Sequence, residues 1–207
     1  MLIEPLMLPR EQLTTVTLDD SLETALDRIN SKSFLSIPVV QDGHFVGMIS
    51  KGEIFEDYFV VGGDKHRYIK ETRVRALIRA GIPTLLPDDE IEKAARTLEL
   101  YGVPFVAVVD AEENFKGIIT HYAIFKEFSE IMGIDKGKRL SIYVKNIPGQ
   151  VARVSEILAR NKADVISFVV AESTKGEDIK QIIARVYCFT MPQLMEDLRK
   201  SGYRVDE

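Results

Sequence analysis

The order of apolar and polar positions along residues 17–59 predicts a small α/β unit. Two short β-type runs occupy 37–40 and 45–49, with turn-forming residues between them, and a helical pattern covers 53–59. Asp19 or Asp20 is placed to cap an earlier helix. One face of that helix carries apolar residues at helical spacing: Leu22, Ala25, Leu26 and Ile29. The predicted order is strand, helix, strand, turn, strand, helix.

The same pattern returns later in the chain. Residues 17–25 align with 86–94, and after a one-residue offset 45–50 align with 115–120. The second unit has its own helical face and two β-runs: Ile91, Ala94, Ala95 and Leu98, then 105–109 and 115–119. Each unit is too small to bury a good core alone, so we expect the two to pack about a pseudo-twofold axis.

A polar stretch at 135–139 predicts a domain boundary, and a third pattern follows it. Strands are expected at 140–145, 165–171 and 181–189, with a helix between the first two. A last helix begins near Thr190 and ends at Gly202. Strand-helix-strand-strand-helix-strand is the ferredoxin-like βαββαβ plan, and the whole chain is therefore predicted to be α+β.

Composition excludes several classes of protein. The 207 residues carry 27 basic and 32 acidic side chains, for a net charge of −5, so neither a nucleic-acid partner nor a membrane partner is expected. The start lacks a charged segment followed by an apolar one, which favours a cytoplasmic location. Three dispersed histidines and the single Cys188 predict no metal site. No catalytic motif is present, so we expect a protein that is not an enzyme and has no catalytic cofactor.

The two repeats resemble CBS domains. The resemblance rests on Ile37-Pro38-Val39-Val40, a short turn, and Gly47-Met48-Ile49-Ser50 followed by Glu53, with a second copy in register. Two CBS domains in tandem resemble a Bateman module, here over about residues 1–132. The expected domains are 1–62 for the first repeat, 63–134 for the linker and second repeat, and 138–207 for the C-terminal domain.

The CBS resemblance implies a cleft between the repeats that accepts an adenine nucleotide or S-adenosylmethionine as a regulatory ligand. In that family, backbone near the Ile37 strand meets the base, and a hydroxyl and a nearby carboxylate meet the ribose. Ala123 stands at the carboxylate position of the second repeat, which puts that site in doubt. The matching positions are Thr15, Thr17, Ile37, Pro38, Ser50 and Glu53 in the first repeat, and Thr84, Ala107 and Thr120 in the second.

Six cations lie between the repeats: Lys65, Arg67, Lys70, Arg73, Arg75 and Arg79. A solvated helix face explains them by itself. The alternative is that Arg73 or Arg75 meets the phosphate of the ligand as a fork-shaped donor. Nucleic acid is a weaker third interpretation, because only one aromatic residue accompanies these cations in an acidic chain.

The C-terminal segment resembles an ACT domain. Asn146, Pro148 and Gly149 match the Asn-x-Pro-Gly turn of the serine-feedback site in phosphoglycerate dehydrogenases, while Val144 and Asp164 replace its His and second Asn. The resemblance implies an amino-acid site, whereas turn geometry alone explains the same residues equally well. The candidate residues are Asn146, Pro148, Gly149, Gln150 and Asp164.

The order CBS, CBS, ACT resembles small regulatory proteins of the acetoin-utilisation B type. We therefore expect a non-catalytic sensor of small-molecule effectors, whose ACT domain binds an amino acid or mediates dimerisation, working as a homodimer with a regulated partner protein. One alternative is a structural or interaction scaffold whose ligand sites have decayed. Another is a minor enzyme of acetoin metabolism.

Overall fold

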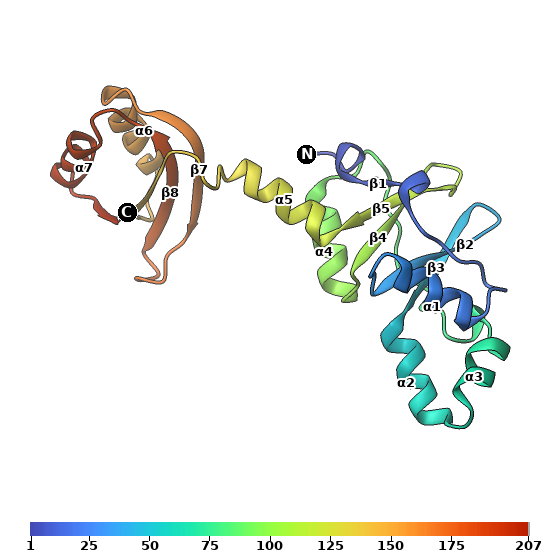
Figure 1. Ribbon diagram of the computed structural model, residues 1–207. Helices are drawn as coiled ribbons and strands as arrows, with labels where there is room; N and C mark the ends of the chain where they lie inside the picture. Colours follow the sequence, from blue (N-terminus) through green and yellow to red (C-terminus); the bar gives the residue numbers. More distant parts are fainter. Residues whose placement is uncertain (207) are drawn as a thin grey trace. The chain divides into compact units, whose positions relative to one another are not determined.

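The computed structural model describes residues 1–206, which divide into two compact units, Met1–Phe125 and a second that starts at Lys126. The first unit contains both repeats (Figure 1). Its helices and strands are η1 (Glu4–Leu6), β1 (Leu8–Pro9), η2 (Arg10–Gln12), α1 (Leu22–Ser31), β2 (Ser36–Gln41), β3 (His44–Ser50), α2 (Lys51–Val61), α3 (Lys65–Glu71), η3 (Val74–Ala76), α4 (Ile91–Tyr101), β4 (Phe105–Val109), β5 (Phe115–Thr120) and the start of α5 (His121–Ile131).

The predicted helix–hairpin–helix pattern of both repeats is confirmed. The apolar face predicted for α1 is buried, and in α4 Ile91, Ala94 and Leu98 are buried likewise. The hairpins β2–β3 and β4–β5 are antiparallel and carry a register shift at the same place, before Val40 and Val109. The N-cap of α1 was predicted wrongly. Ser21 caps this helix by accepting a hydrogen bond from Thr24 N at 3.1 Å.

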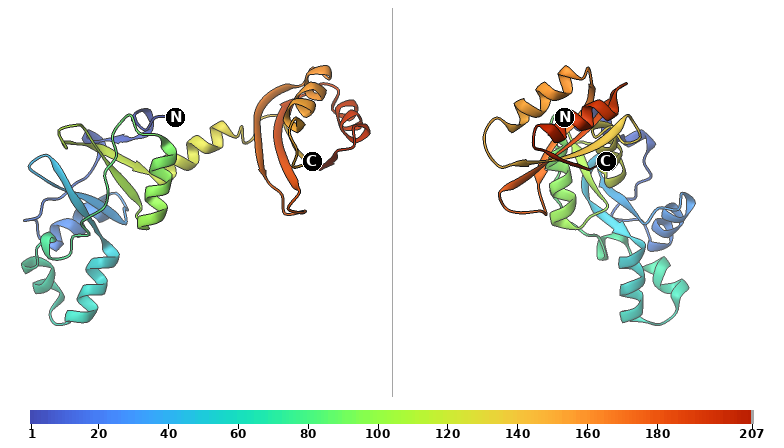
Figure 2. Two further views of the ribbon diagram at one scale, coloured as in Figure 1. Left: turned by 180° about the vertical axis from the view of Figure 1, so that it is seen from behind. Right: turned by 90° about the vertical axis from the view of Figure 1, so that its left-hand side faces the viewer.

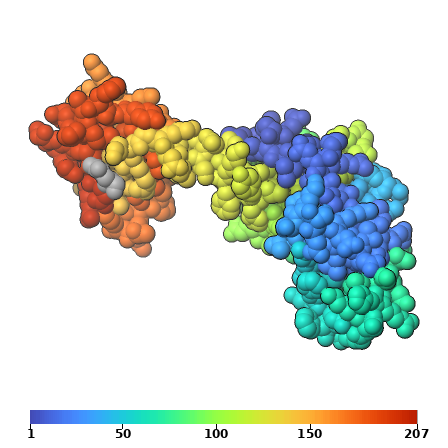
Figure 3. All heavy atoms as spheres, in the orientation of Figure 1, coloured from blue at the N-terminus to red at the C-terminus, as the bar shows by residue number. Residues whose placement is uncertain are grey.

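The segment ahead of each repeat crosses to the other repeat. Leu8 and Pro9 of β1 pair with Ile118 and Gly117 of β5, and a bridge joins Arg79, ahead of the second repeat, to Met48 of β3. Figure 3 shows the N-terminal segment lying against the second repeat. The strand predicted at the start of each unit is therefore wrong, since Val16 and Leu85 form only isolated bridges within their own repeats. The exchange holds the two repeats together.

A glycine makes each crossing possible. A Cβ atom on Gly47 would lie 2.5 Å from Arg79 O, and one on Gly117 would overlap Leu8 O. Side chains cannot be accommodated there, because the crossing backbone already occupies the space. The sequence pattern that repeats at 47–50 and 117–120 thus has a packing cause in addition to any role in binding.

The region between the repeats contains the helix α3, which a short turn at residues 62–64 separates from α2. Gly62 ends α2 with a φ of 68°, and Asp64 caps α3 by accepting from Arg67 N at 2.7 Å. The hydroxyl of Tyr68 on α3 donates to Asp57 Oδ2 on α2 at 2.6 Å. This bond and burial of the ring raise the pKa of Tyr68, with burial as the larger cause.

The second unit is one antiparallel sheet with two helices. Its elements are β6 (Lys138–Lys145), α6 (Gln150–Arg160), β7 (Asp164–Glu172), β8 (Ile179–Tyr187), α7 (Met191–Lys200) and β9 (Arg204–Asp206). The strand order is β7-β8-β6-β9, and both helices cover the same face (Figure 2). Their apolar residues form a core with Leu140, Ile142 and Val144 of β6.

The predicted order of elements in this unit is confirmed. The division between the compact units falls inside α5, whereas the polar stretch 135–139 was expected to mark it. A regular helical pattern continues through Lys126, so the sequence contains no sign of a division there. The last helix ends as expected, with Ser201 as its C-cap and Gly202 after it at a φ of 87°.

Candidate functional site

An apolar groove of about 340 Å³ lies between the two repeats. β2 and the segment before it form one side, while β4, β5 and the N-terminal segment form the other. Three predicted residues line the groove, namely Ile37, Pro38 and Thr120. The remaining lining residues are Leu8, Leu13, Thr14, Ser33, Phe34, Leu35, Ser36, Pro104, Phe105 and Ile118. None of them is charged, so the groove suits a flat apolar group such as a nucleobase better than a phosphate.

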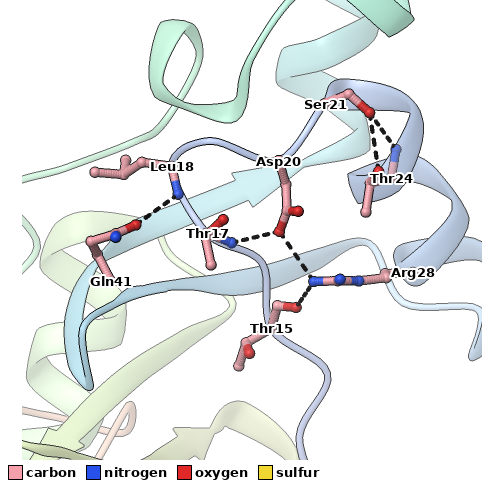
Figure 4. A network of polar contacts seen from close by, with 8 residues as sticks. All are labelled: Thr15, Thr17, Leu18, Asp20, Ser21, Thr24, Arg28 and Gln41. Carbon is pink, nitrogen blue, oxygen red and sulfur yellow. Dashed lines mark hydrogen bonds and ion pairs between the residues drawn. The ribbon is translucent and has the colours of Figure 1, made fainter.

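Thr15 and Thr17 belong to a polar network beside the groove, drawn in Figure 4. Arg28 Nη1 donates to Thr15 O at 2.7 Å and to Asp20 Oδ2 at 3.2 Å. Asp20 Oδ2 also accepts from Thr17 N at 2.8 Å. The amide of Thr17 and the carbonyl of Thr15 therefore already have partners, and this network fixes the loop that leads into α1.

Ser50 and Glu53 form a capping box at the start of α2. Ser50 Oγ accepts from Glu53 N at 3.1 Å, and Glu53 Oε2 accepts from Ser50 N at 2.9 Å and from Ser50 Oγ at 2.8 Å. One carboxylate oxygen of Glu53 thus stabilises the helix start. Neither residue lines the apolar groove. The spacing Ser-x-x-Glu was the signal in the sequence for this local role.

Arg73 and Arg75 are exposed and lie outside the groove. Arg75 pairs with Asp19, an ion pair inside the first unit, and its amide donates to Leu18 O at 3.1 Å. Arg73 precedes η3 and forms a backbone bridge with Ser21. These contacts join the linker to the first repeat.

Of the residues predicted in the second repeat, Thr120 alone lines the groove. Thr120 Oγ1 accepts from Ala123 N at 3.2 Å at the start of α5. Ala107 is fully buried in β4, where its carbonyl accepts from Leu85 N at 2.9 Å, and Thr84 is exposed. The two repeats are thus alike in backbone and unequal in the residues that reach the groove.

The predicted amino-acid site is divided in the second unit. Asn146, Pro148, Gly149 and Gln150 line a groove of about 230 Å³ together with Val170, Lys180 and Ile182. Asp164 pairs with Tyr187 at the end of β8, whereas Asn146 N donates to Asp178 O just before β8 begins. Asp164 and Asn146 therefore lie at opposite ends of the sheet. One chain therefore does not bring Asp164 to the Asn146 loop.

Sequence reasoning missed most of the groove between the repeats. Leu8 and Ile118 reach it because β1 pairs with the other repeat, which no local pattern announces. The apolar pair Phe34-Leu35, just before the strand β2, was the available signal in the sequence, and the structure leaves Leu35 75% exposed.

Two wider searches cover residues 1–206. No helix there is long and apolar enough to cross a membrane. Within the same residues, no three His, Cys, Asp or Glu side chains gather where they could hold a metal ion.

Two interlocked α/β repeats with a groove between them define a class of paired ligand-binding modules. The chain belongs to the CBS domain family, whose model matches residues 6–59 and 74–130. The chain is 28% identical over 120 residues to UPF0053 protein YugS of Bacillus subtilis. It is 24% identical over 116 residues to an uncharacterised protein of Methanocaldococcus jannaschii. The matches cover 55% and 56% of this chain, but only 28% and 40% of the length of these curated relatives.

Solved structures share the fold. A CBS domain-containing protein of unknown function from Bacillus anthracis matches at 25% identity with a TM-score of 0.57, over 62% of this chain and 93% of its own. CBSX2 in complex with AMP matches at 24% identity and a TM-score of 0.52, over 63% and 97%. CbpB in complex with c-di-AMP matches at 19% identity and a TM-score of 0.52, over 62% and 85%.

Proposed function

We propose that the CBS pair of this protein is a regulatory sensor that binds an adenine nucleotide in the groove between its repeats. The observation that carries the proposal is the apolar groove lined by Ile37, Pro38 and Thr120, in a chain of the CBS family. Its volume falls within the roughly 300–1,000 Å³ of small-molecule sites. Structural neighbours hold AMP and c-di-AMP, which supports an adenine ligand. Glu53, Arg73 and Arg75 remain candidate contacts only if binding rearranges their present bonds.

Thermal unfolding tests this proposal. The purified chain is heated with AMP, ADP, ATP, c-di-AMP or S-adenosylmethionine, and a ligand at about 100 times its dissociation constant should add roughly 2.7 kcal/mol of stability. Leu35→Asp places a charge in the apolar groove and should abolish the shift. Leu100→Asp is the matched control, since Leu100 is 68% exposed on α4 and does not line the groove. A shift that survives Leu35→Asp would place the ligand elsewhere.

The second unit is, in this proposal, an ACT domain that binds an amino acid at the Asn146 loop of a homodimer. Support comes from the βαββαβ order and from β7, a nine-residue edge strand with Val165 and Val170 nearly half exposed. Antiparallel pairing of two β7 strands would carry Asp164 of a second copy toward the Glu172 end, which is also the Asn146 end. Val165→Lys should then lower the mass measured by sedimentation, and Leu100→Lys should not.

A scaffold function is the second candidate, and three observations favour it. Ala123 lacks the carboxylate expected in the second repeat, Glu53 is engaged in a capping box, and Arg75 is paired with Asp19. A Glu53→Ala, Asn146→Ala double variant separates the two functions. A scaffold keeps its oligomeric mass and its captured partner in this variant, whereas a sensor loses its response to nucleotide and amino acid. The acetoin-related assignment rests on the order of domains alone.

A further inference from the structure

A second cavity, of about 520 Å³, opens at one end of the C-terminal sheet. The end of β6, the first turn of α6, the β7–β8 turn and the loop into β9 all contribute to its wall. It touches the smaller groove of the Asn146 loop through four shared residues, but neither Arg153 nor Arg204 lines that groove. Its volume is that of a small-molecule site.

Positive charge dominates the wall of this cavity. Four cations line it: Lys145, Arg153, Lys175 and Arg204. Asp206 pairs with two of them, Lys175 at 3.0 Å and Arg204 at 3.7 Å. The side chains of Lys145 and Arg153 form no ion pair or hydrogen bond with any of residues 1–206. Two cations at the cavity therefore lack an opposite charge.

An aromatic ring holds the other two cations in place. Lys175 Nζ lies 3.9 Å from the centroid of the Tyr143 ring, and Arg204 Cζ lies 5.7 Å from it. The hydrogen bond from Lys175 to Asp206 is the largest cause that raises the pKa of Lys175. Lys175 is therefore charged at neutral pH.

Gln150 supplies a neutral donor to the same cavity. Its side chain is only 8% exposed, and its Oε1 accepts from the Tyr203 hydroxyl at 3.2 Å. Its Nε2 forms no hydrogen bond with residues 1–206. Every fully buried side-chain nitrogen in that range has a hydrogen-bond partner, so Nε2 is not fully buried. That amide nitrogen therefore keeps contact with solvent in the cavities that Gln150 lines. A buried amide held on one side by Tyr203 is a preorganised donor.

We propose that this cavity binds the phosphate group of a small phosphomonoester, with Arg153, Lys145 and the Gln150 amide as its ligands. Two unpaired cations match a charge near −2, and three phosphate oxygens match a fork-shaped Arg, an ammonium and an amide. A carboxylate has one charge and two oxygens and leaves part of this set unused. The site is separate from the nucleotide groove, but Lys145 and Gln150 also line the amino-acid groove, so Arg153 is the ligand that belongs to this cavity alone.

Nuclear magnetic resonance of the full chain tests the site. Inorganic phosphate, glycerol 3-phosphate and succinate are titrated separately at millimolar concentration, and the backbone amides of Gln150 and Gly202 are followed. Both phosphate probes should shift these amides, with succinate weaker, and added salt should weaken binding because it screens the charges. Absence of these shifts with both phosphate probes, or tighter binding of succinate, overturns the proposal.

Matched variants decide whether the cavity itself is responsible. Arg153→Gln should weaken glycerol 3-phosphate at least fivefold, or about 1 kcal/mol, and Arg204→Gln should weaken it to a smaller degree because Arg204 is shared with Asp206. Arg160→Gln is the control, since Arg160 is on the same helix and does not line the cavity. Equal losses from Arg153→Gln and Arg160→Gln would show general charge attraction and refute the site.

Discussion

The crossing of β1 over the second repeat makes a sharp prediction about Gly117. An added Cβ would overlap the carbonyl oxygen of Leu8 and lie 3.1 Å from Pro9 Cα, where ordinary contacts begin at 3.4 Å. In Gly117→Ala, the β1 backbone must therefore move by about 1 Å in a packed interior. Overpacking of this kind costs about 1–3 kcal/mol, and each weakened strand bond adds about 0.5–1.5 kcal/mol. Alanine has less conformational entropy than glycine in the unfolded chain, which offsets about 0.4–1 kcal/mol of this loss. We expect a net loss near 2 kcal/mol.

Calorimetry and hydrogen exchange measure this loss. For a unit of this size, about 2 kcal/mol corresponds to a fall of roughly 6–10 °C in Tm. Exchange should rise in peptides that contain Leu8 and Pro9 and stay unchanged in β6. Gly52→Ala is the control, because Gly52 lies in α2 and an added Cβ there would meet Ser50 Oγ at an ordinary 3.7 Å. This variant should gain about 0.5–1 kcal/mol of stability. If Gly117→Ala melts with the wild type, the crossing of β1 described above is incorrect.

Three further predictions concern polar contacts. Ser50→Ala removes the capping box of α2 and should lower the free energy of unfolding in urea by about 1 kcal/mol. Ser50→Thr should retain most of that stability, and an equal loss in both variants would contradict a capping role. The pKa of Tyr68 is raised in the folded state, so the stability it contributes is complete below the unfolded pKa of about 10 and is lost as pH rises above that value. One of the seven tyrosines should therefore titrate after the rest. Tyr68→Phe should remove that late step. The hydrogen bond from Asn161 is the largest cause that lowers the pKa of Asp197. The stability that it contributes is present above the unfolded pKa and is lost as pH falls through the folded pKa. Asn161→Ala should raise the pKa of Asp197 in a titration followed by nuclear magnetic resonance, and an unchanged titration would count against the contact.

Local patterns predicted the helices and hairpins because each element is determined by its own periodicity. The helical spacing of apolar residues correctly indicated the buried positions, namely Leu22, Ala25, Leu26 and Ile29 in α1 and Ile91, Ala94 and Leu98 in α4. The first strand of each repeat was predicted wrongly, since Val16 and Leu85 form only isolated bridges. The pairing of Leu8 with the other repeat was missed, because a one-dimensional pattern contains no information on exchange between repeats. The cap of α1 failed for a different reason. Asp19, Asp20 and Ser21 all suit an N-cap, and Asp20 is occupied by Thr17 and Arg28.

The candidate site was predicted unevenly for the same reason. Residues taken from a linear motif fell into two groups: Ile37, Pro38 and Thr120 line the groove, while Ser50 and Glu53 serve the start of α2. A carboxylate three residues after a serine has two uses, ribose binding and helix capping, and the sequence does not separate them. Which use applies depends on whether a ligand reaches that helix start, and this is a property of the tertiary fold.

The unequal repeats also bear on the charge of the ligand. α5 begins at His121, directly after Thr120, and has no acidic residue in its first turn, whereas α2 has Glu53 there. The N-terminus of an eleven-residue helix carries a partial positive charge, and at α5 no carboxylate of the first turn offsets it. Ala123, which suggested a decayed site when the sequence was considered alone, therefore leaves the Thr120 end of the groove favourable to an anion. S-adenosylmethionine has a cationic sulfonium where AMP has phosphate. On this argument the groove should prefer AMP, and tighter binding of S-adenosylmethionine would mean that the charge at the start of α5 does not govern selection.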